Sequence, residues 1–564
     1  MSRSLARVVM AFAAAFFAVF LLWPVVQILK GGFVDADGRL TFAFLGELLR
    51  NRLYLGGLEN SFLLAFSTTV LALLIAVPLA LIAHCYRFPA KILLTSLILV
   101  PMVLPPFVGA IGIKQIFGQY GAFNALIIAT GVRPAGWTFD WFAVSPFWGV
   151  AIVEALGLYP LVYLNAVAAL ASVDPTMEEA AASLGCTRLR RFWRITLPLI
   201  KPGLFAGSTI VFIWTFTELG VPIIFDYNQV TPVQIYHGLH DFGANPFPYV
   251  LAFIMLASCL GLYAVGKGVF GRKSYAMMTR ATVGSGPRSP SPLPAWACTA
   301  LFSGVTLVAV LPHLGVVLVA FAKTWHGTVL PSRFTADNFR LALGSDLTVP
   351  AIANSLKYSC LSTCIDVVLG IAIAHVIVRT RIAGRALLDF LVMLPLAVPG
   401  LVLAFGYLSM TQNGRVFSFL NPIANPTFLL VIAYSVRRLP YMVRSAAAGF
   451  QQTSETLEEA AANLGCPPLK TTIRITLPLI MANLIAGGLL AFAFAMLEVS
   501  DSLVLAQKRA FYPITKAIFE LFQLLGDGRF LASALGAWAM VFLGVVILAA
   551  AALLGRKLSA AFRV

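Results

Sequence analysis

Glu218 and Glu498 are the two residues whose type and position point most clearly to chemistry. Each lies in an apolar stretch, WTFTELGVP or FAMLEVSDS, and the two occupy matching places in a repeat within the chain. A carboxylate is costly to bury in apolar surroundings, so such residues usually bind a ligand or form an ion pair. Asp501 lies three residues after Glu498 in the same stretch. We expect these three acids to line a path for a small solute, and symmetric carboxylates would suit a cation.

The alternative is that each acid pairs with a base inside the protein. The other ionisable residues in apolar stretches are Glu154, Lys357, Asp366, Arg437 and Arg438. An ion pair with one of these three bases would neutralise Glu218 or Glu498 without any ligand. The sequence leaves both interpretations open.

No cofactor is expected on this chain. Residues Gly261–Lys267, GLYAVGK, match the start of a phosphate-binding loop. However, Gly268 stands where Ser or Thr would bind magnesium, and the stretch ends an apolar run instead of following a strand. The residues also define no set of metal ligands, so the sequence assigns no metal site.

A longer stretch is repeated shortly before each of the two glutamates. It reads EAAASLGCTRLRRFWRITLP at Glu179–Pro198 and EAAANLGCPPLKTTIRITLP at Glu459–Pro478. In each copy Glu-Ala-Ala is followed by a glycine, and then by Ile-Thr-Leu-Pro, at the same spacing. The agreement in order and spacing predicts two segments with the same structure and the same role.

Each copy predicts a short helix, a glycine stop and a second helical stretch. Alanine and glutamate favour helix, and acids are stabilised near a helix N-terminus. Asp174 and, in the second copy, Ser454 are suitable N-caps. Gly185 and Gly465 supply the left-handed conformation that ends a helix. We expect the leucine before each glycine to pack inward.

The composition identifies the elements that must position these residues as membrane helices. The chain of 564 residues is 60% hydrophobic and only 11% charged, with a mean hydropathy of +0.89. Soluble domains carry about 25% charged residues. The net charge of +17 is interpreted through topology, because membrane proteins collect Lys and Arg on their cytoplasmic side. We therefore expect an all-α integral membrane protein that does not bind nucleic acid.

Apolar runs of about 20 residues, enough to cross a bilayer, occur twelve times in two sets of six. They lie near Val8–Leu29, Ser61–His84, Ile92–Ile113, Phe147–Ala171, Gly203–Ile224, Tyr249–Val269, Leu293–Ala322, Ala351–Val378, Ala386–Met410, Thr427–Phe450, Ala482–Ala506 and Leu531–Leu554. Six spans in each set bring the second half into the membrane from the same side as the first. The sequence thus predicts twelve transmembrane helices arranged as two parallel six-helix modules.

The predicted modules are joined by a linker. The first module comprises residues 1–270 with its repeated loop at 174–198, and the second comprises 294–564 with its loop at 454–478. Residues 271–293 between them are rich in Ser, Gly, Pro and basic residues, as is typical of a flexible linker. With the N-terminus inside, more than half of the 40 Lys and Arg residues lie in cytoplasmic segments. Both termini and both repeated loops are therefore predicted to be cytoplasmic.

The repeated stretch resembles the EAA loop in the permease subunits of binding-protein-dependent, type I ABC importers, and the resemblance covers both halves. It implies a multi-pass protein of the bacterial inner membrane, surrounded by lipid. The implied partners are two copies of a cytoplasmic ATP-binding subunit and a periplasmic substrate-binding protein. ATP and magnesium would be bound by the partner ATPase, so this chain would be a permease and not an enzyme.

In that family the loop contains a coupling helix that docks on the ATPase and receives its movement. Carried over to matching positions, the coupling residues are Glu178, Glu179, Ala180, Ala181 and Gly185 in the first loop and Glu458, Glu459, Ala460, Ala461 and Gly465 in the second. Substrate would arrive from the binding protein, and ATP-driven closure of the ATPase pair would switch the spans between outward-open and inward-open states.

The fused two-module form resembles the branch that includes ferric-iron, thiamine, phosphonate and phosphosugar permeases. Ferric iron is favoured because WTFTELGVPIIF resembles that branch, while thiamine, aminophosphonate, polyamine and sugar phosphate remain alternatives. A different class, the ion-driven secondary transporter, would use the same spans and buried acids. That class has no reason to keep two EAA loops.

Overall fold

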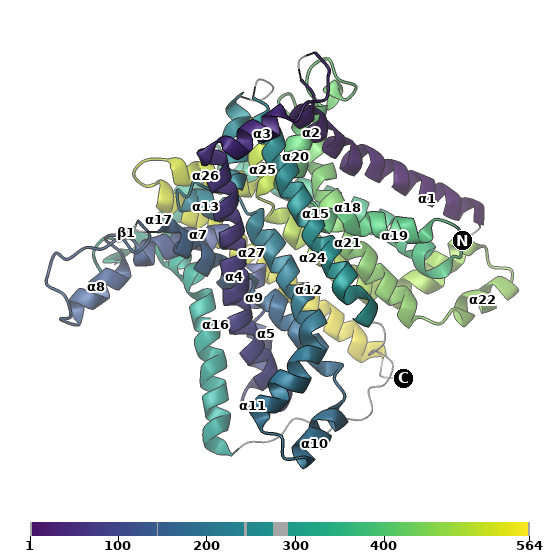
Figure 1. Cartoon of the computed structure of the whole chain (residues 1–564), viewed down its shortest axis with the longest axis horizontal. Coiled ribbons are helices and arrows are strands. Elements are labelled where there is room, and N and C mark those ends of the chain that lie inside the picture. The colour runs from purple at the N-terminus through teal and green to yellow at the C-terminus, as the bar shows by residue number, and fades with distance from the viewer. Residues whose placement is uncertain (1–2, 36, 144, 242–244, 275–290, 562–564) are drawn as a thin grey trace. The chain divides into compact units, whose positions relative to one another are not determined.

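The computed structural model of the protein describes residues 3–35, 37–143, 145–241, 245–274 and 291–561. Nearly all regular structure in these ranges is helical (Figure 1). The described residues form one short hairpin, in which β1 (Ala322–Thr324) pairs antiparallel with β2 (Arg333–Phe334) and Ala322 lies opposite Phe334. Most of the predicted linker, 271–293, lies outside the described residues.

The chain forms two compact units, and each unit draws segments from both halves of the sequence. The first-half unit comprises Leu49–Gln234 and Ala257–Asn338, and the second-half unit comprises Met1–Leu48, Ile235–Leu256 and Phe339–Val564. These units are defined by contacts, whereas the modules 1–270 and 294–564 are defined by the sequence repeat. The elements at or near the points where the chain passes between units are α3 (Ala43–Arg50), α14 (Thr231–His237), η3 (Gly238–Asp241), α15 (Phe247–Ser274) and α17 (Asp337–Leu343).

The first-half unit is built on three long helices that pack against one another, α4, α9 and α12. Its helices are α4 (Arg52–Cys85), α5 (Lys91–Leu97), α6 (Val100–Val103), α7 (Pro106–Phe117), α8 (Ala122–Ala129), α9 (Pro146–Ala171), α10 (Pro175–Ser183), α11 (Arg188–Arg191), η2 (Phe192–Thr196), α12 (Leu197–Phe216), α13 (Gly220–Ile224) and α16 (Pro292–Ala320). Small residues such as Ala72, Ala76 and Ala166 are buried in its core. Such residues let helix backbones approach closely where lipid replaces water.

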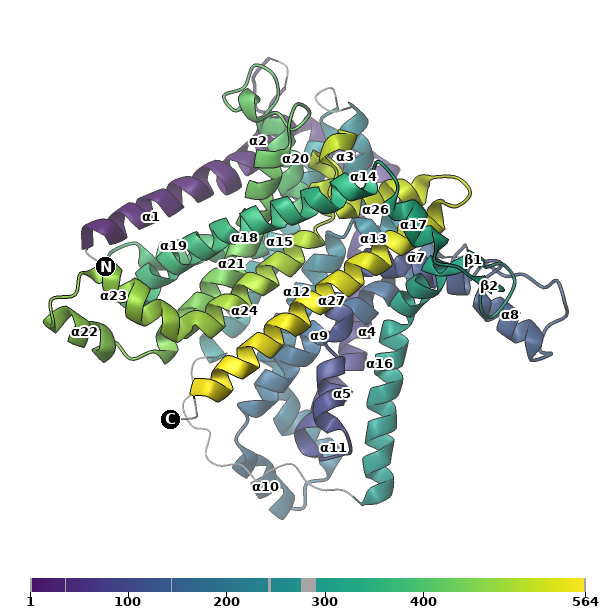
Figure 2. The ribbon, with the colours of Figure 1, turned by 180° about the vertical axis from the view of Figure 1, so that it is seen from behind.

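The second-half unit repeats this plan. Its helices are α1 (Arg3–Phe17), η1 (Ala18–Leu22), α2 (Trp23–Phe33), α18 (Thr348–Arg379), α19 (Arg385–Met393), η4 (Leu394–Leu396), α20 (Gly400–Met410), η5 (Ser418–Leu420), α21 (Thr427–Gln452), α22 (Thr456–Asn463), α23 (Pro468–Thr471), η6 (Thr472–Thr476), α24 (Leu477–Met496), α25 (Ser500–Leu505), η7 (Arg509–Phe511), α26 (Ile514–Gln523) and α27 (Gly528–Ala561). Helices α18, α21, α24 and α27 lie side by side (Figure 2).

In each unit, the first span of one sequence half packs on helices of the other half. Helix α1 runs along α18 and α19, and α2 packs on α20 (Figure 1). In the first-half unit, α16 packs on α7 in the corresponding way. Gly112 of α7 permits this contact, because a Cβ atom there would collide with the Pro312 carbonyl oxygen of α16. The first span of each half therefore belongs to the opposite unit.

Among the described residues, nine helices are long and apolar enough to cross a membrane, and eleven spans result if each of two bent helix pairs crosses once. The predicted straight spans Ile92–Ile113 and Ala386–Met410 are these bent pairs. The first joins Lys91–Met102 to Pro106–Ala129 at 94°, and the second joins Arg385–Leu396 to Gly400–Met410 at 100°. Pro105 and Pro399 lie at the breaks, where proline disfavours continuation of the preceding helix.

The predicted span Thr427–Phe450 forms helix α21 but is not one of the nine. It carries three arginines, Arg437, Arg438 and Arg444, within its apolar length. The structure thus supports an all-helical membrane protein with nine to eleven candidate spans in the described residues. Hydropathy does not identify α21 as one of them.

Candidate functional site

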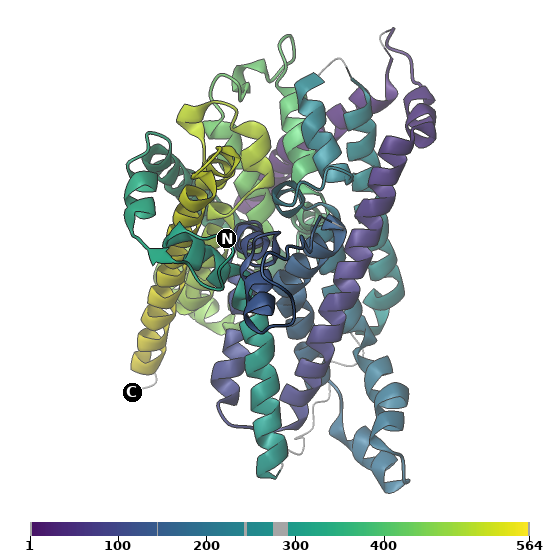
Figure 3. The same cartoon turned by 90° about the vertical axis from the view of Figure 1, so that its left-hand side faces the viewer.

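The first repeated stretch forms the predicted helix, glycine stop and second helix. The Asp174 carboxylate caps α10 by accepting hydrogen bonds from the Thr176 N–H at 2.9 Å and the Thr176 hydroxyl at 2.8 Å. These two bonds hold the pKa of Asp174 below its usual value, because they favour the charged carboxylate. Gly185 then adopts φ +76° and ends the helix. In Figure 3 the loop with α10 and α11, in blue, projects beyond the end of α4.

The second stretch repeats this geometry with a different cap. The Ser454 hydroxyl accepts a hydrogen bond from the Thr456 N–H at 3.3 Å, two residues along as in the first loop. Helix α22 begins at Thr456, and Glu455 is its flanking residue. Gly465 adopts φ +78°. The predicted N-cap Ser454 thus lies one residue before the N-cap of α22, Glu455, whose side chain makes no capping bond. The two loops share the glycine stop and a side-chain bond to the matching threonine N–H.

Backbone bonds close both helices in the same way. The Cys186 N–H donates to the Ala181 carbonyl oxygen at 3.0 Å, and the Cys466 N–H donates to that of Ala461 at 2.9 Å. Each bond reaches back across the glycine and satisfies a carbonyl that the helix end would leave unpaired. Ala181 and Ala461 thus take part in the stop, while Ala180 and Ala460 remain exposed.

The prediction that the leucine before each glycine packs inward is wrong. Leu184 and Leu464 are each 88% exposed. They belong to a set of large apolar side chains exposed at matching positions of both loops: Met177, Leu184, Leu189 and Trp193 in the first, and Leu457, Leu464, Leu469 and Ile473 in the second. A repeated apolar surface of this kind is typical of a binding face.

The two glutamates of each loop differ in position. Glu178 accepts a hydrogen bond from the Thr196 hydroxyl at 2.6 Å, and Glu458 accepts one from the matching Thr476 hydroxyl at 3.2 Å. Each bond joins the loop helix to the turn that starts the next long helix. Glu179 and Glu459 are exposed. The first acid of each pair therefore holds the loop together, and the second is available to a partner.

Glu218 and Glu498 occupy the same structural position in their units. Glu218 lies in the joint between α12 and α13, and Glu498 lies in the joint between α24 and α25. The Glu218 carboxylate accepts a hydrogen bond from the Gly220 N–H at 2.9 Å. The sequence had predicted that both acids lie within continuous spans. In the structure each lies at a break between two helices.

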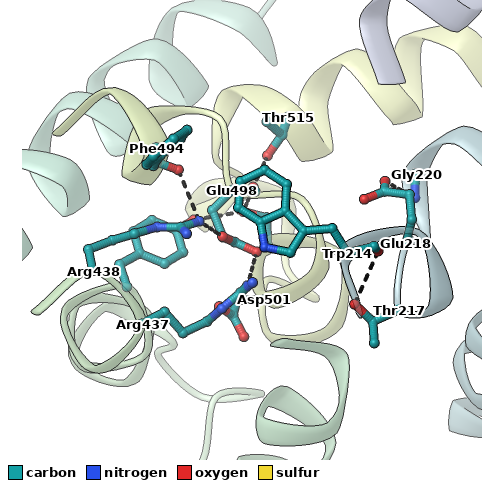
Figure 4. A network of polar contacts seen from close by, with 12 residues as sticks. Trp214, Thr217, Glu218, Gly220, Arg437, Arg438, Phe494, Glu498, Asp501 and Thr515 are labelled. Atoms are coloured by element: carbon teal, nitrogen blue, oxygen red, sulfur yellow. Dashed lines mark hydrogen bonds and ion pairs between the residues drawn. The ribbon is translucent and has the colours of Figure 1, made fainter. Parts of the chain in front are cut away.

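Glu498 forms the internal ion pairs that the alternative interpretation describes. Arg437 Nη1 lies 2.5 Å from Glu498 Oε1, and Arg438 Nη2 contacts Oε2 (Figure 4). Glu498 is 5% exposed. The two arginines are successive residues of α21, so one carboxylate connects this helix to the end of α24. Gly400 leaves room for the network, since a Cβ atom there would meet the Arg437 guanidinium.

Three further buried acids, Asp501, Glu154 and Asp366, have an oxygen without a hydrogen-bond partner among the described residues; for Asp366 it is Oδ2. Asp501 Oδ2 lies 3.4 Å from Arg437 Nη1, but its Oδ1 has no such partner. Glu154 of α9 is 2% exposed, and its Oε1 has none either. Within the described residues, no group of three or more His, Cys, Asp or Glu side chains is arranged to hold a metal ion.

Sequence reasoning missed three residues that position the loops, Thr196, Thr476 and Arg379. The two threonines belong to the repeated Ile-Thr-Leu-Pro, so their identity in both copies was a usable signal. Arg379 contacts Glu455 and Glu458, and nothing in the first half of the sequence predicts it.

Comparison with known proteins places both repeats in one family model. The model for the binding-protein-dependent transport system inner membrane component matches residues 76–273 and again residues 366–560. Each match contains one repeated loop and the joint acid that follows it.

Individual relatives match over most of the chain. The ferric transport system permease protein FbpB of Actinobacillus pleuropneumoniae is 26% identical over 85% of this chain and 69% of its own length. The Fe(3+)-transport system permease protein FbpB 2 of Haemophilus influenzae is 24% identical over 79% of this chain and 80% of its own. The sulfate transport system permease protein CysT of Salmonella typhimurium is 26% identical, over 42% of this chain and 84% of its own.

Proposed function

Because the chain belongs to the family of binding-protein-dependent transport system inner membrane components, it is a non-catalytic ABC importer permease, and we propose that it transports ferric iron. The family implies a partner ATPase and a substrate-binding protein. The observation that carries the proposal is that the two relatives named for ferric iron match both halves of the chain. The sulfate permease matches less than half of it.

We propose that each exposed loop docks one copy of the ATP-binding subunit. Leu184 and Leu464 would enter the partner with the apolar side chains around them, and Glu179 and Glu459 would meet its polar groups. A leucine removed from water contributes about 1.5–3 kcal/mol. The predicted coupling residues then fall into two groups, those that shape the loop and those that contact the ATPase. They are Glu178–Ala181 with Gly185, and Glu458–Ala461 with Gly465.

Glu218, Glu498 and Asp501 are retained as the proposed substrate path, with different roles. Arg437 and Arg438 already neutralise Glu498, so its carboxylate serves to hold α21 against the end of α24. Asp501 lies beside Arg437 in the same network, so of the three acids Glu218 is the one proposed to meet a passing cation directly. A path of this kind need not bind iron tightly, because the binding protein selects the substrate.

The topology proposed for this function has twelve spans with both termini in the cytoplasm. It requires α21 to cross the membrane although it carries three arginines. The pairing of Arg437 and Arg438 with buried acids supports this, because neutralised arginines lower the cost of crossing.

The test is transport by the complete complex of this chain, its ATPase and its binding protein in proteoliposomes. We expect radiolabelled ferric iron to accumulate only when ATP and the iron-loaded binding protein are both present. If iron is not taken up, the same assay with radiolabelled thiamine, aminophosphonate, polyamine or sugar phosphate identifies the substrate. Uptake driven by a proton or sodium gradient, without the ATPase, would favour the secondary-transporter class and contradict the proposal.

A further inference from the structure

The two repeated loops are held in place by different bases. In the first loop, Arg191 Nε lies 3.9 Å from Glu178 Oε2, and Arg191 belongs to the same loop. In the second loop, the base next to Glu458 is Arg379, the last residue of α18. One loop is thus braced from within, and the other is braced to a long helix.

Arg379 makes several polar contacts with the second loop. Its Nη2 donates to the Thr453 carbonyl oxygen at 2.6 Å, its Nη1 lies 3.2 Å from Glu455 Oε1, and its Nε lies 3.4 Å from Glu458 Oε1. A guanidinium can hold three acceptors in fixed directions because it is planar and rigid. The Arg379 side chain is 7% exposed and that of Glu458 is 22% exposed, so this pair is partly shielded from water and salt, whereas Glu455 is 63% exposed.

The same side chain also contacts the end of α21. Its Cζ atom lies 5.8 Å from the centre of the Phe450 ring, a distance at which a cation is attracted to an aromatic face. Arg379 therefore joins three elements: the end of α18, the end of α21 and the start of α22.

The first half has no arginine at the matching position. Helix α4 ends at Cys85 as α18 ends at Arg379, and a cysteine is too short to form such a clamp. Near the end of α4, the Glu178 carboxylate acts electrostatically on His84, but these two described residues form no hydrogen bond or ion pair like that between Arg379 and Glu458. The hydrogen bond there runs from Arg188 Nη1 to the Tyr86 hydroxyl at 3.2 Å and is exposed. Exposed contacts of this kind contribute little to stability.

Helix α18 connects the clamp to the buried ion-pair network. The Ser435 hydroxyl of α21 donates to Asp366 Oδ1 of α18 at 2.6 Å, and Arg437 and Arg438 follow on the same helix. A displacement of α22 is therefore passed to α18 and α21 together. The threonine bonds of Glu178 and Glu458 link the loops to α12 and α24 in both halves, so the link from the second loop to α18 is what differs.

We propose that Arg379 is a positioning residue that makes the second loop a rigid extension of α18, so that the two loops transmit ATPase movement unequally. This rests on the proposed function, in which both loops receive that movement. Removal of the clamp leaves the ATPase docked on the second loop while α18 no longer follows it. ATP is then hydrolysed with less transport.

The test compares Arg379→Ala with Tyr86→Phe, which removes the exposed contact near the end of α4. Both variants are measured in the complete complex for binding-protein-stimulated ATP hydrolysis and for uptake of radiolabelled ferric iron. We expect Arg379→Ala to lower the iron transported per ATP about fivefold or more, the usual scale of a coupling between sites. Tyr86→Phe should leave this ratio within about twofold of the original.

Two further variants separate positioning from folding. Arg379→Lys keeps the charge but cannot hold three acceptors, so it should give an intermediate ratio. In a cysteine-free background, Arg379→Cys with Glu455→Cys should lose coupling and regain it when a thiol-reactive linker joins the two sites, because Glu455 contacts Arg379 and the Thr476 bond of Glu458 is left intact. A loss of folding would not be repaired in this way.

The inference is overturned if Arg379→Ala keeps the original ratio, if Tyr86→Phe lowers it equally, or if the linker does not restore it. Its failure is distinct from failure of the proposed function. A complex of the unmodified chain in which the binding protein does not stimulate ATP hydrolysis would contradict the proposed function itself.

Discussion

Gly185 and Gly465 hold a conformation that other residues adopt only with strain. Both have positive φ, and a Cβ atom at either position would meet nothing within 4 Å. The requirement is therefore conformational and not steric. A non-glycine residue in this region costs about 1–2 kcal/mol, which changes a population by about 5- to 30-fold.

We predict that Gly185→Ala combined with Gly465→Ala will lower binding-protein-stimulated ATP hydrolysis about tenfold, on that scale, without removing the protein from the membrane. Steady-state ATPase assays and the amount of protein in the membrane check this. The control is asparagine at both sites, which tolerates the left-handed conformation and should retain most of the activity. An alanine double variant with full stimulation would contradict the prediction.

Asp174 gives the side-chain cap of the first loop a response to pH that the Ser454 bond of the second loop lacks. Its two bonds from Thr176 lower its pKa, so the cap is complete above the ordinary pKa of an aspartate. The cap is lost as the pH falls through the lower pKa of the folded protein. Ser454 does not titrate in this range, so acidification should remove the side-chain bond to the Thr176 N–H and leave the side-chain bond to the Thr456 N–H.

Hydrogen exchange at Thr176 and Thr456, corrected for intrinsic rates, checks this prediction. With falling pH, protection should decrease at Thr176 and remain at Thr456. Asp174→Asn keeps an efficient cap and should remove the difference between the loops. Equal loss of protection in both loops of the unmodified chain would contradict it.

At the scale of elements, the sequence predicted the loops because their structure is local. A cap, a run of alanines and a glycine lie within 11 residues of each other, from Asp174 to Gly185 and from Ser454 to Gly465, which is about three helical turns. Local propensity therefore places them. The joint at Glu498 was less accessible, because it depends on Arg437 and Arg438 about sixty residues earlier. Arg437 and Arg438 were among the possible partners, but the sequence did not show which base pairs with Glu498.

The inward packing of Leu184 and Leu464 was wrongly predicted for a physical reason. Burial was inferred from residue type, but the packing of the described chain leaves both leucines 88% exposed. An exposed leucine at the same position of two loops has a different explanation, namely a partner that covers it. The leucines are therefore expected to be buried by a partner chain and not by this one.

We predict that Leu184→Ser combined with Leu464→Ser will weaken binding of the ATPase subunit about tenfold or more. The loss follows from the apolar contact that each leucine would provide, about 1.5–3 kcal/mol. The affinity of detergent-solubilised permease for the isolated ATPase checks it. The matched control is Leu525→Ser, because Leu525 is 99% exposed but lies outside the loops. Equal effects of the two changes would contradict a specific docking face.

At the scale of the whole molecule, hydropathy alone does not decide whether α21 crosses the membrane. Its apolar residues meet the length requirement, but an unpaired arginine at the bilayer centre costs about 2.5–3.5 kcal/mol or more. Glu498 and Asp501 lie beside Arg437, so the charges enter the membrane as pairs. Helix α21 is also packed between α18 and α24, which keeps these pairs away from lipid. Tertiary contacts thus lower the cost of burying the arginines, which a hydropathy window does not take into account.

We predict that the two ends of α21 lie on opposite sides of the membrane. The chain has 7 cysteines, and in a variant without them Asn421→Cys and Ser454→Cys place one label site beyond each end of the helix. In intact spheroplasts a membrane-impermeant maleimide should label Asn421→Cys and leave Ser454→Cys unlabelled until the membrane is opened. Labelling of both positions from one side would mean that α21 does not cross the membrane. The protein would then lack the twelfth span, and the two repeated loops would not both lie in the cytoplasm.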